Sequence, residues 1–194
     1  MTIECKSSRD KPWVLFTDDT SSPSLFSMRW QRLGVPNQAW LWKAVRKANS
    51  RKLPTPLLDG YGPFGYALAR TFASKNEDVA FSAMMSVAKA AAGLREQLAA
   101  AHKDFGSDDA MHAVVLPVLV VDAPLLKCEL DDDGTERLSR IDRGTVLWKY
   151  QLTPGHPPST IVTIVTPAAL PSLADDLNKT ADSLYASAIG KKPA

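Results

Sequence analysis

The first residues of the chain alternate between polar and apolar side chains. This period of two, over residues 2–6, predicts a β-strand. On such a strand Ile3 and Cys5 share one face, and Glu4 and Lys6 share the other. The N-terminal strand therefore presents an acid and a lysine side by side.

The pattern after residue 6 predicts an alternation of strands and helices. The clearest helix covers 76–103, where many alanines predict close packing on a sheet. Pro117 inside a predicted strand indicates a bulge or an edge, and Asp131 to Gly134 has the composition of a hairpin turn. The other expected helices are at 25–33, 36–48 and 167–189, and the expected strands are at 12–16, 113–121, 125–130, 136–141, 145–151 and 160–165.

Composition changes this picture little. The 194 residues are 45% hydrophobic and 23% charged with a formal net charge of +2, which is typical of one globular domain. No apolar run approaches the roughly 18 residues of a membrane span. Cys5 and Cys128 cannot form a disulfide scaffold, and no signal-peptide pattern opens the chain. We therefore expect a cytoplasmic protein without a membrane segment.

We expect one α/β domain over 1–194, with a mixed central sheet flanked by helices. No internal repeat and no second apolar core interrupts it. Its expected parts are the strand and apolar run at 1–16, a basic helical insertion with a Gly/Pro loop at 24–75, the long helix at 76–103, the C-terminal strands at 113–166 and the last helix at 167–189.

The triplet Glu4-Cys5-Lys6 is the first feature that suggests chemistry. A carboxylate beside an ammonium on one strand face is what a metal-dependent phosphodiesterase needs, because one holds a divalent cation and the other stabilises developing charge. The alternative is a solvent-facing ion pair on an edge strand, since such a triplet also arises by chance.

The context of the triplet resembles a known family. The segment from Ile3 to Phe16 is similar to the half-motif of the PD-(D/E)XK superfamily of restriction-endonuclease-like nucleases, in which an apolar strand ends in Glu-x-Lys. The segment from Val118 to Leu126 resembles the C-terminal sheet of such proteins. The resemblance implies that Glu4 and the main-chain carbonyl of Cys5 bind Mg²⁺, that Lys6 is the catalytic lysine, and that the substrate is DNA.

One departure from the family pattern concerns the N-terminus. The family places a metal-binding aspartate on a strand before Glu-x-Lys, whereas only Met1 and Thr2 precede Ile3 here. Asp10, Asp18 and Asp19 lie downstream, and their spacing does not show that they substitute. We therefore expect an N-terminally incomplete nuclease fold, which would be a truncated reading frame, a degenerate copy or a fragment completed by a partner chain.

A basic stretch is the second candidate feature. Lysines and arginines supply phosphate contacts, and the interleaved Trp30, Trp40 and Trp42 could stack on bases. The alternative is that the tryptophans belong to the core while the cations are solvated. The candidate nucleic-acid-binding residues are Arg29, Arg32, Lys43, Arg46, Lys47, Arg51 and Lys52, with no acid among them.

Three further features favour ordinary structure over chemistry. Residues 60–65 satisfy the G-x-G-x-x-G expression of dinucleotide-binding loops, but no strand-like segment precedes them and Pro63 removes a donor. The three histidines lack the spacing of zinc ligands. Cys5 and Cys128 have the pattern of small buried strand residues rather than nucleophiles.

Three functional hypotheses remain open from the sequence. The first is a Mg²⁺-dependent DNA endonuclease-like domain that is inactive as an isolated chain. The second is a non-catalytic nucleic-acid or protein interaction module that keeps the nuclease fold. The third is an unrelated α/β protein with a chance Glu-x-Lys.

Overall fold

The computed structural model describes residues 2–7, 11–17, 38–57, 63–70, 79–104, 115–131, 133–148 and 160–189. Within these ranges the strands form one sheet in the order β1-β4-β8-β7-β3-β2-β5-β6. They are β1 (Thr2–Ser7), β2 (Trp13–Thr17), β3 (Phe64–Arg70), β4 (Pro117–Asp122), β5 (Leu125–Leu130), β6 (Glu136–Ile141), β7 (Arg143–Trp148) and β8 (Thr160–Val165). The helices are α2 (Gln38–Ser50), α3 (Val79–Asp104) and α4 (Leu170–Ile189), with a 3₁₀ turn at Pro167–Ala169.

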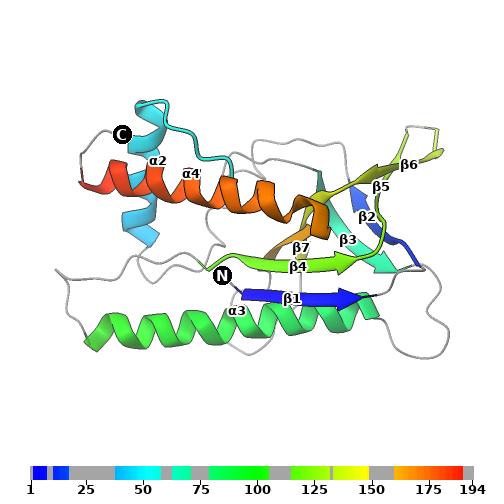
Figure 1. Cartoon of the computed structure of the whole chain (residues 1–194), viewed down its shortest axis with the longest axis horizontal. Helices are drawn as coiled ribbons and strands as arrows, with labels where there is room; N and C mark the ends of the chain where they lie inside the picture. The colour runs from blue at the N-terminus through cyan, green and yellow to red at the C-terminus, as the bar shows by residue number, and fades with distance from the viewer. Residues whose placement is uncertain are drawn as a thin grey trace.

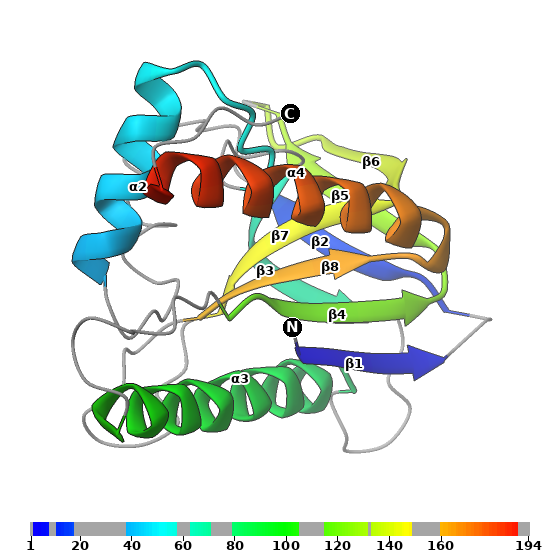
Figure 2. The ribbon, with the colours of Figure 1, turned by 60° about the vertical axis from the view of Figure 1, so that its left-hand side comes forward.

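The sheet is mixed and lies between helices. Strand β4 is parallel to both of its neighbours, β1 and β8, whereas β7 runs antiparallel to β8. Helix α3 covers one face of the sheet and α4 covers the other, with α2 crossing the C-terminal end of α4 (Figures 1 and 2). The predicted α/β class with a mixed, helix-flanked sheet is confirmed.

Strand β4 shows how the two layers are separated. Val118 and Val120 belong to the cluster beneath α4, and Leu119 and Val121 belong to the cluster beneath α3. Because successive residues of a strand face opposite sides, this continuous apolar run supplies both cores.

Helix α3 packs on the sheet through small side chains, as its composition predicts. Ala80, Ala83, Met84, Val87 and Ala91 are fully buried. Because alanine side chains are small, the helix can approach the strands closely. Its buried face therefore consists mainly of small residues rather than large aliphatic ones.

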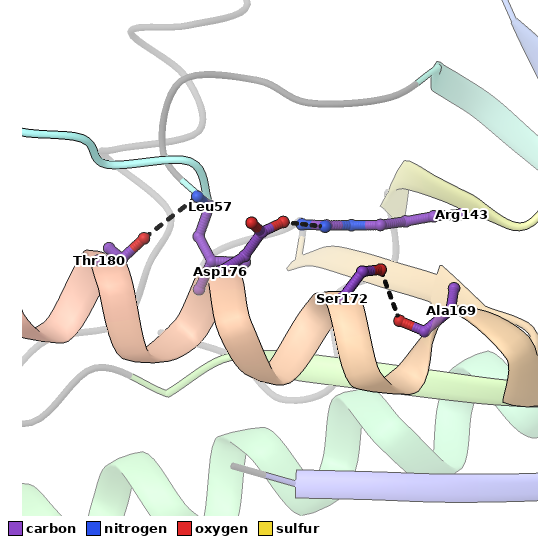
Figure 3. Close-up of polar contacts among 6 residues, drawn as sticks. All are labelled: Leu57, Arg143, Ala169, Ser172, Asp176 and Thr180. Atoms are coloured by element: carbon purple, nitrogen blue, oxygen red, sulfur yellow. Dashed lines mark hydrogen bonds and ion pairs between the residues drawn. The ribbon is translucent and has the colours of Figure 1, made fainter.

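The opposite layer is fixed by both apolar and polar contacts. Leu173 and Leu184 of α4 pack in one cluster with Val45 of α2. Arg143 of β7 donates to the carboxylate of Asp176 on α4 in a partly buried ion pair (Figure 3). This ion pair ties the helix to the start of β7.

Residues 51–57, which follow α2, also lie against α4. The main-chain N–H of Leu57 donates to the Thr180 hydroxyl at 3.2 Å (Figure 3), and Thr55 is fully buried. Prolines near this contact limit the freedom of the chain, so the segment is held on the helix although it is neither helix nor strand.

Strand β3 contradicts the expected insertion over 24–75. Residues 64–70 form a strand between β2 and β7, inside the sheet rather than in a loop outside it. Phe64, Tyr66 and Leu68 alternate with glycine and alanine, which have low β propensity. The strand pairs along its length with β2 and at Phe64 and Gly65 with β7. The predicted helix at 25–33 lies outside the described residues.

Several predicted boundaries also shift. Pro117 is the first residue of β4, an interior strand, so the expected bulge or edge is wrong; a proline at a strand's first position costs no ladder hydrogen bond. The turn before β6 is confirmed, with Gly134 at φ 80° and its N–H donating to the Asp131 carbonyl at 2.8 Å.

In the part of the chain that the structure describes, no helix has the length and apolar character to span a membrane.

We predict opposite effects of the same substitution at two glycines. A Cβ added at Gly65 would collide with the Leu15 side chain and lie 2.8 Å from the Phe16 carbonyl oxygen, whereas at Gly93 of α3 an added Cβ would meet no atom within 4 Å. Gly65→Ala should lower the free energy of unfolding by about 1–3 kcal/mol. Gly93→Ala should raise it by about 0.5–1 kcal/mol. Urea unfolding measures both, and equal effects would contradict the packing described.

Candidate nucleic-acid interface and Glu-x-Lys strand

Strand β1 places the Glu-x-Lys triplet at an edge of the sheet. It pairs in parallel with β4, with Glu4 in register with Leu119 and Lys6 in register with Val121. The expectation that the N-terminal segment is a strand in the same sheet as residues 113–121 is therefore confirmed. A helical or detached N-terminus would have ended the nuclease hypothesis.

The register also identifies the sheet face that these positions occupy. Leu119 and Val121 have no exposed surface and lie in the cluster under α3, and α3 packs on β1 as well. Positions in register on parallel strands share a face. The Glu4 and Lys6 positions therefore belong to the α3 face, and that of Cys5 to the α4 face.

The described acids do not complete a metal site around this strand. The register partners of Glu4 and Lys6 on β4 are apolar, and Asp122 is in register with Ser7, at a position of the other face. Among the residues whose side chains the structure describes, no three acids, histidines or cysteines gather to hold a metal ion. Mg²⁺ binding by Glu4 and the Cys5 carbonyl therefore stays a prediction, and we assign no metal-dependent step to it. Asp18 and Asp19 lie outside the described residues.

Helix α2 separates apolar from basic residues. Ala44, Val45 and Ala48 are buried against the α4 layer, while every described cation from residue 43 to residue 52 is exposed. The helix contains no acidic residue. The exposed cations, here called the α2 basic face, are Lys43, Arg46, Lys47, Arg51 and Lys52.

The other predicted contacts of this stretch are not placed. Arg29 and Arg32 lie outside the described residues, as does Trp30. Trp40 and Trp42 belong to α2, but whether their rings lie in the core stays a prediction.

The end of α2 has a specific backbone geometry. The Leu53 N–H donates to the Ala48 carbonyl and the Lys52 N–H to the Asn49 carbonyl, both at 3.0 Å. This is the Schellman pattern, in which the residue after the helix is left-handed. Lys52 adopts φ 55° there, and it is the one non-glycine residue with positive φ among those described. Lysine therefore occupies a left-handed backbone position in which glycine would have the lower conformational energy.

Arg51 has a structural partner. Its Nη1 donates to the carbonyl oxygen of Ala186 at 3.4 Å, one of the last four carbonyls of α4, which lack intrahelical donors. Because cations near a helix C-terminus are stabilising, this contact explains Arg51 without any ligand. The basic-face residues for which no such contact is seen within the described ranges are Lys43, Arg46, Lys47 and Lys52.

The glycine-rich segment leads into a strand at Phe64. A dinucleotide-binding loop leads into a helix, whereas strand β3 begins here at Phe64. Gly65 lies inside that strand under Leu15. The interpretation of 60–65 as structural rather than cofactor-binding is the one the fold favours.

Charged groups that sequence reasoning missed lie on β5 and α3. Lys127 and Glu129 form a partly buried ion pair at 2.6 Å, with the same one-residue spacing as Glu4 and Lys6, so strand periodicity could have found it.

Burial lowers the pKa of Arg95, whose Nε and Nη2 lack hydrogen-bond partners in the described structure. Burial also raises the pKa of the Cys128 thiol, consistent with an inert strand residue.

Comparisons with protein families, curated proteins and solved structures give no match for this chain.

We predict that Lys52→Gly stabilises the protein. Removing the Cβ relieves the left-handed backbone at this position, which should raise the free energy of unfolding by about 1 kcal/mol. Lys47→Gly is the matched control, because it removes the same charge within the helix and should cost about 1 kcal/mol. Urea unfolding distinguishes the two. A Lys52→Gly variant with a lower free energy of unfolding than the wild type would contradict the backbone strain inferred at Lys52.

Proposed function

We propose that this chain is a nucleic-acid-binding module, with DNA as its partner, that contacts the phosphate backbone through the α2 basic face. The supporting observation is the separation on α2, where exposed cations occur without any acid and buried residues attach the helix to the α4 layer. A rigid helix on a packed core presents its charges in a fixed array, which suits repeated phosphate contacts.

The spacing of the cations supports this proposal. Lys43 and Lys47 are four residues apart, so they project from one side of the helix about one turn apart, and Arg46 lies beside them. A net charge of only +2 means that attraction to phosphate must come from such local separation of charge. Lys52 extends the array just beyond the helix end.

A restriction-endonuclease-like phosphodiesterase is our second proposal. It is favoured by the position of Glu4 and Lys6 on one face of a strand in the main sheet. The described acids do not complete a Mg²⁺ site there, so further ligands would have to come from residues outside the described ranges, such as Asp18 or Asp19, or from another chain. We rank it below the binding function for that reason.

We also propose a reducing, cytoplasmic location. The chain has two cysteines, and Cys128 is a free, buried thiol. Extracellular domains more often use cysteines in disulfides.

We predict that neutralising two cations of the basic face weakens DNA binding. In the double variant Lys43→Gln/Lys47→Gln, loss of two phosphate contacts should reduce the slope of log K against log salt by about 1.8 for duplex DNA. Affinity should fall by about ten-fold or more for all sequences alike. Fluorescence anisotropy over a salt series measures both quantities.

The control removes the same charge from exposed lysines of other helices. Lys89→Gln/Lys179→Gln changes α3 and α4 by the same amount and should leave the salt slope unchanged. Equal losses in both double variants would show a general charge effect. An unchanged slope in the α2 variant would show that its cations are merely solvated, and the proposal would be wrong.

We predict that the chain shows no Mg²⁺-dependent DNA cleavage beyond that of its Glu4→Gln and Lys6→Ala variants. A single carboxylate holds Mg²⁺ weakly, because the ion keeps most of its water shell. Nicking of supercoiled plasmid with and without Mg²⁺ is the measurement. Cleavage by the wild-type chain that both variants abolish would make the second proposal the function, with an acid such as Asp18 or Asp19 completing the site.

A further inference from the structure

Strand β6 leaves one edge of the sheet open. It is last in the strand order and pairs with β5 alone among the described strands. Residues 136–140 are all exposed. The β5–β6 hairpin extends beyond the ends of α3 and α4 (Figure 1). This edge is therefore accessible along its length to another strand.

The hairpin turn determines which backbone groups point outward. The Asp131 N–H donates to the Thr135 carbonyl at 3.0 Å, so residues 131 and 135 form a hydrogen-bonded pair. Hydrogen-bonded and non-hydrogen-bonded pairs alternate along an antiparallel ladder. The N–H and C=O groups of Glu136, Leu138 and Arg140 consequently point away from β5, toward the open edge.

The same hairpin exposes apolar surface. Leu130 is 59% exposed and Leu138 is 56% exposed, although both are large aliphatic residues. Leu130 is in register with Glu136, two residues from Leu138, so the two leucines lie on one face of the hairpin. An apolar pair beside an open strand edge is a typical contact surface.

We propose that β6 pairs antiparallel with β6 of a second copy of this chain, centred on Leu138. In that register Leu138 lies opposite Leu138 of the second copy, and Glu136 lies opposite Arg140 of the second copy. Two-fold symmetry repeats the Glu136–Arg140 pair on the other side of the centre. All of these pairs use the backbone groups that point outward.

Charge complementarity selects both the partner and the register. Shifting by two residues either way puts Leu138 opposite Glu136 or Arg140 of the second copy and leaves the charges unmatched. Edge strands that avoid pairing usually carry charges that repel a copy of themselves. Here Glu136, Leu138 and Arg140 follow one another at intervals of two residues. Antiparallel pairing of two copies about Leu138 therefore places each glutamate opposite an arginine.

The test is a charge-swap experiment on the full chain. Wild-type protein should show concentration-dependent dimerisation by sedimentation velocity. Glu136→Arg and Arg140→Glu should each weaken dimerisation about ten-fold or more, since each places like charges opposite one another twice. Mixed in equal amounts, the two variants should form a heterodimer. In that pair one copy has arginine at both positions 136 and 140, the other has glutamate at both, and every cross-strand pair is again of opposite charge.

Lys89→Glu is the control, because it makes the same charge reversal as Arg140→Glu on an exposed part of α3, away from the edge. It should dimerise like the wild type. Thermal unfolding of each variant shows that the fold is kept. A monomeric wild type at all concentrations would overturn the proposal. Dimerisation that neither charge reversal weakens would also overturn the proposal. So would a mixture of the two variants that does not dimerise.

Discussion

The rest of the structure depends on the burial of β4 on both faces. Residues 117–121 are buried, and alternate side chains enter the α3 and α4 layers. Because water reaches neither face, the backbone must find its hydrogen bonds in neighbouring strands, and parallel pairing with β1 and β8 supplies them. The layers, and the position of the N-terminal strand, follow from this single apolar run.

Two apolar layers restrict where charge can act. Charges in the centre of the sheet would lose hydration without compensation. Arg143 is accordingly paired with Asp176 and Lys127 with Glu129, whereas Arg95 is partly buried and its Nε and Nη2 lack partners in the described structure. The α2 basic face and the β6 edge are both peripheral features. The first is proposed to bind phosphate and the second to bind another copy, and neither proposal requires the other.

Sequence patterns identified most elements but missed a strand inside the sheet. Helix α3 and strands β5 and β6 lie close to their predicted limits. Strand β3 was missed because the prolines and glycines before it indicated a loop, although Phe64, Tyr66 and Leu68 alternate with small residues as in a strand. Its pairing with β2 and β7 places it inside the sheet. Pro117 was expected to mark a bulge or an edge because proline lacks an N–H for the ladder of hydrogen bonds. The sequence pattern did not show that β4 begins at this residue, where no such bond is needed.

The sequence by itself determined the α/β class, the period-two arrangement of Glu4 and Lys6 and the acid-free basic stretch, because each depends on residues close together in the chain. Tertiary structure decided which sheet face the Glu-x-Lys positions occupy, since that depends on the register with β4. It also decided that Arg51 supports the end of α4 and that β6 is an open edge. Those outcomes arise from contacts between distant segments, which no local pattern of side chains records.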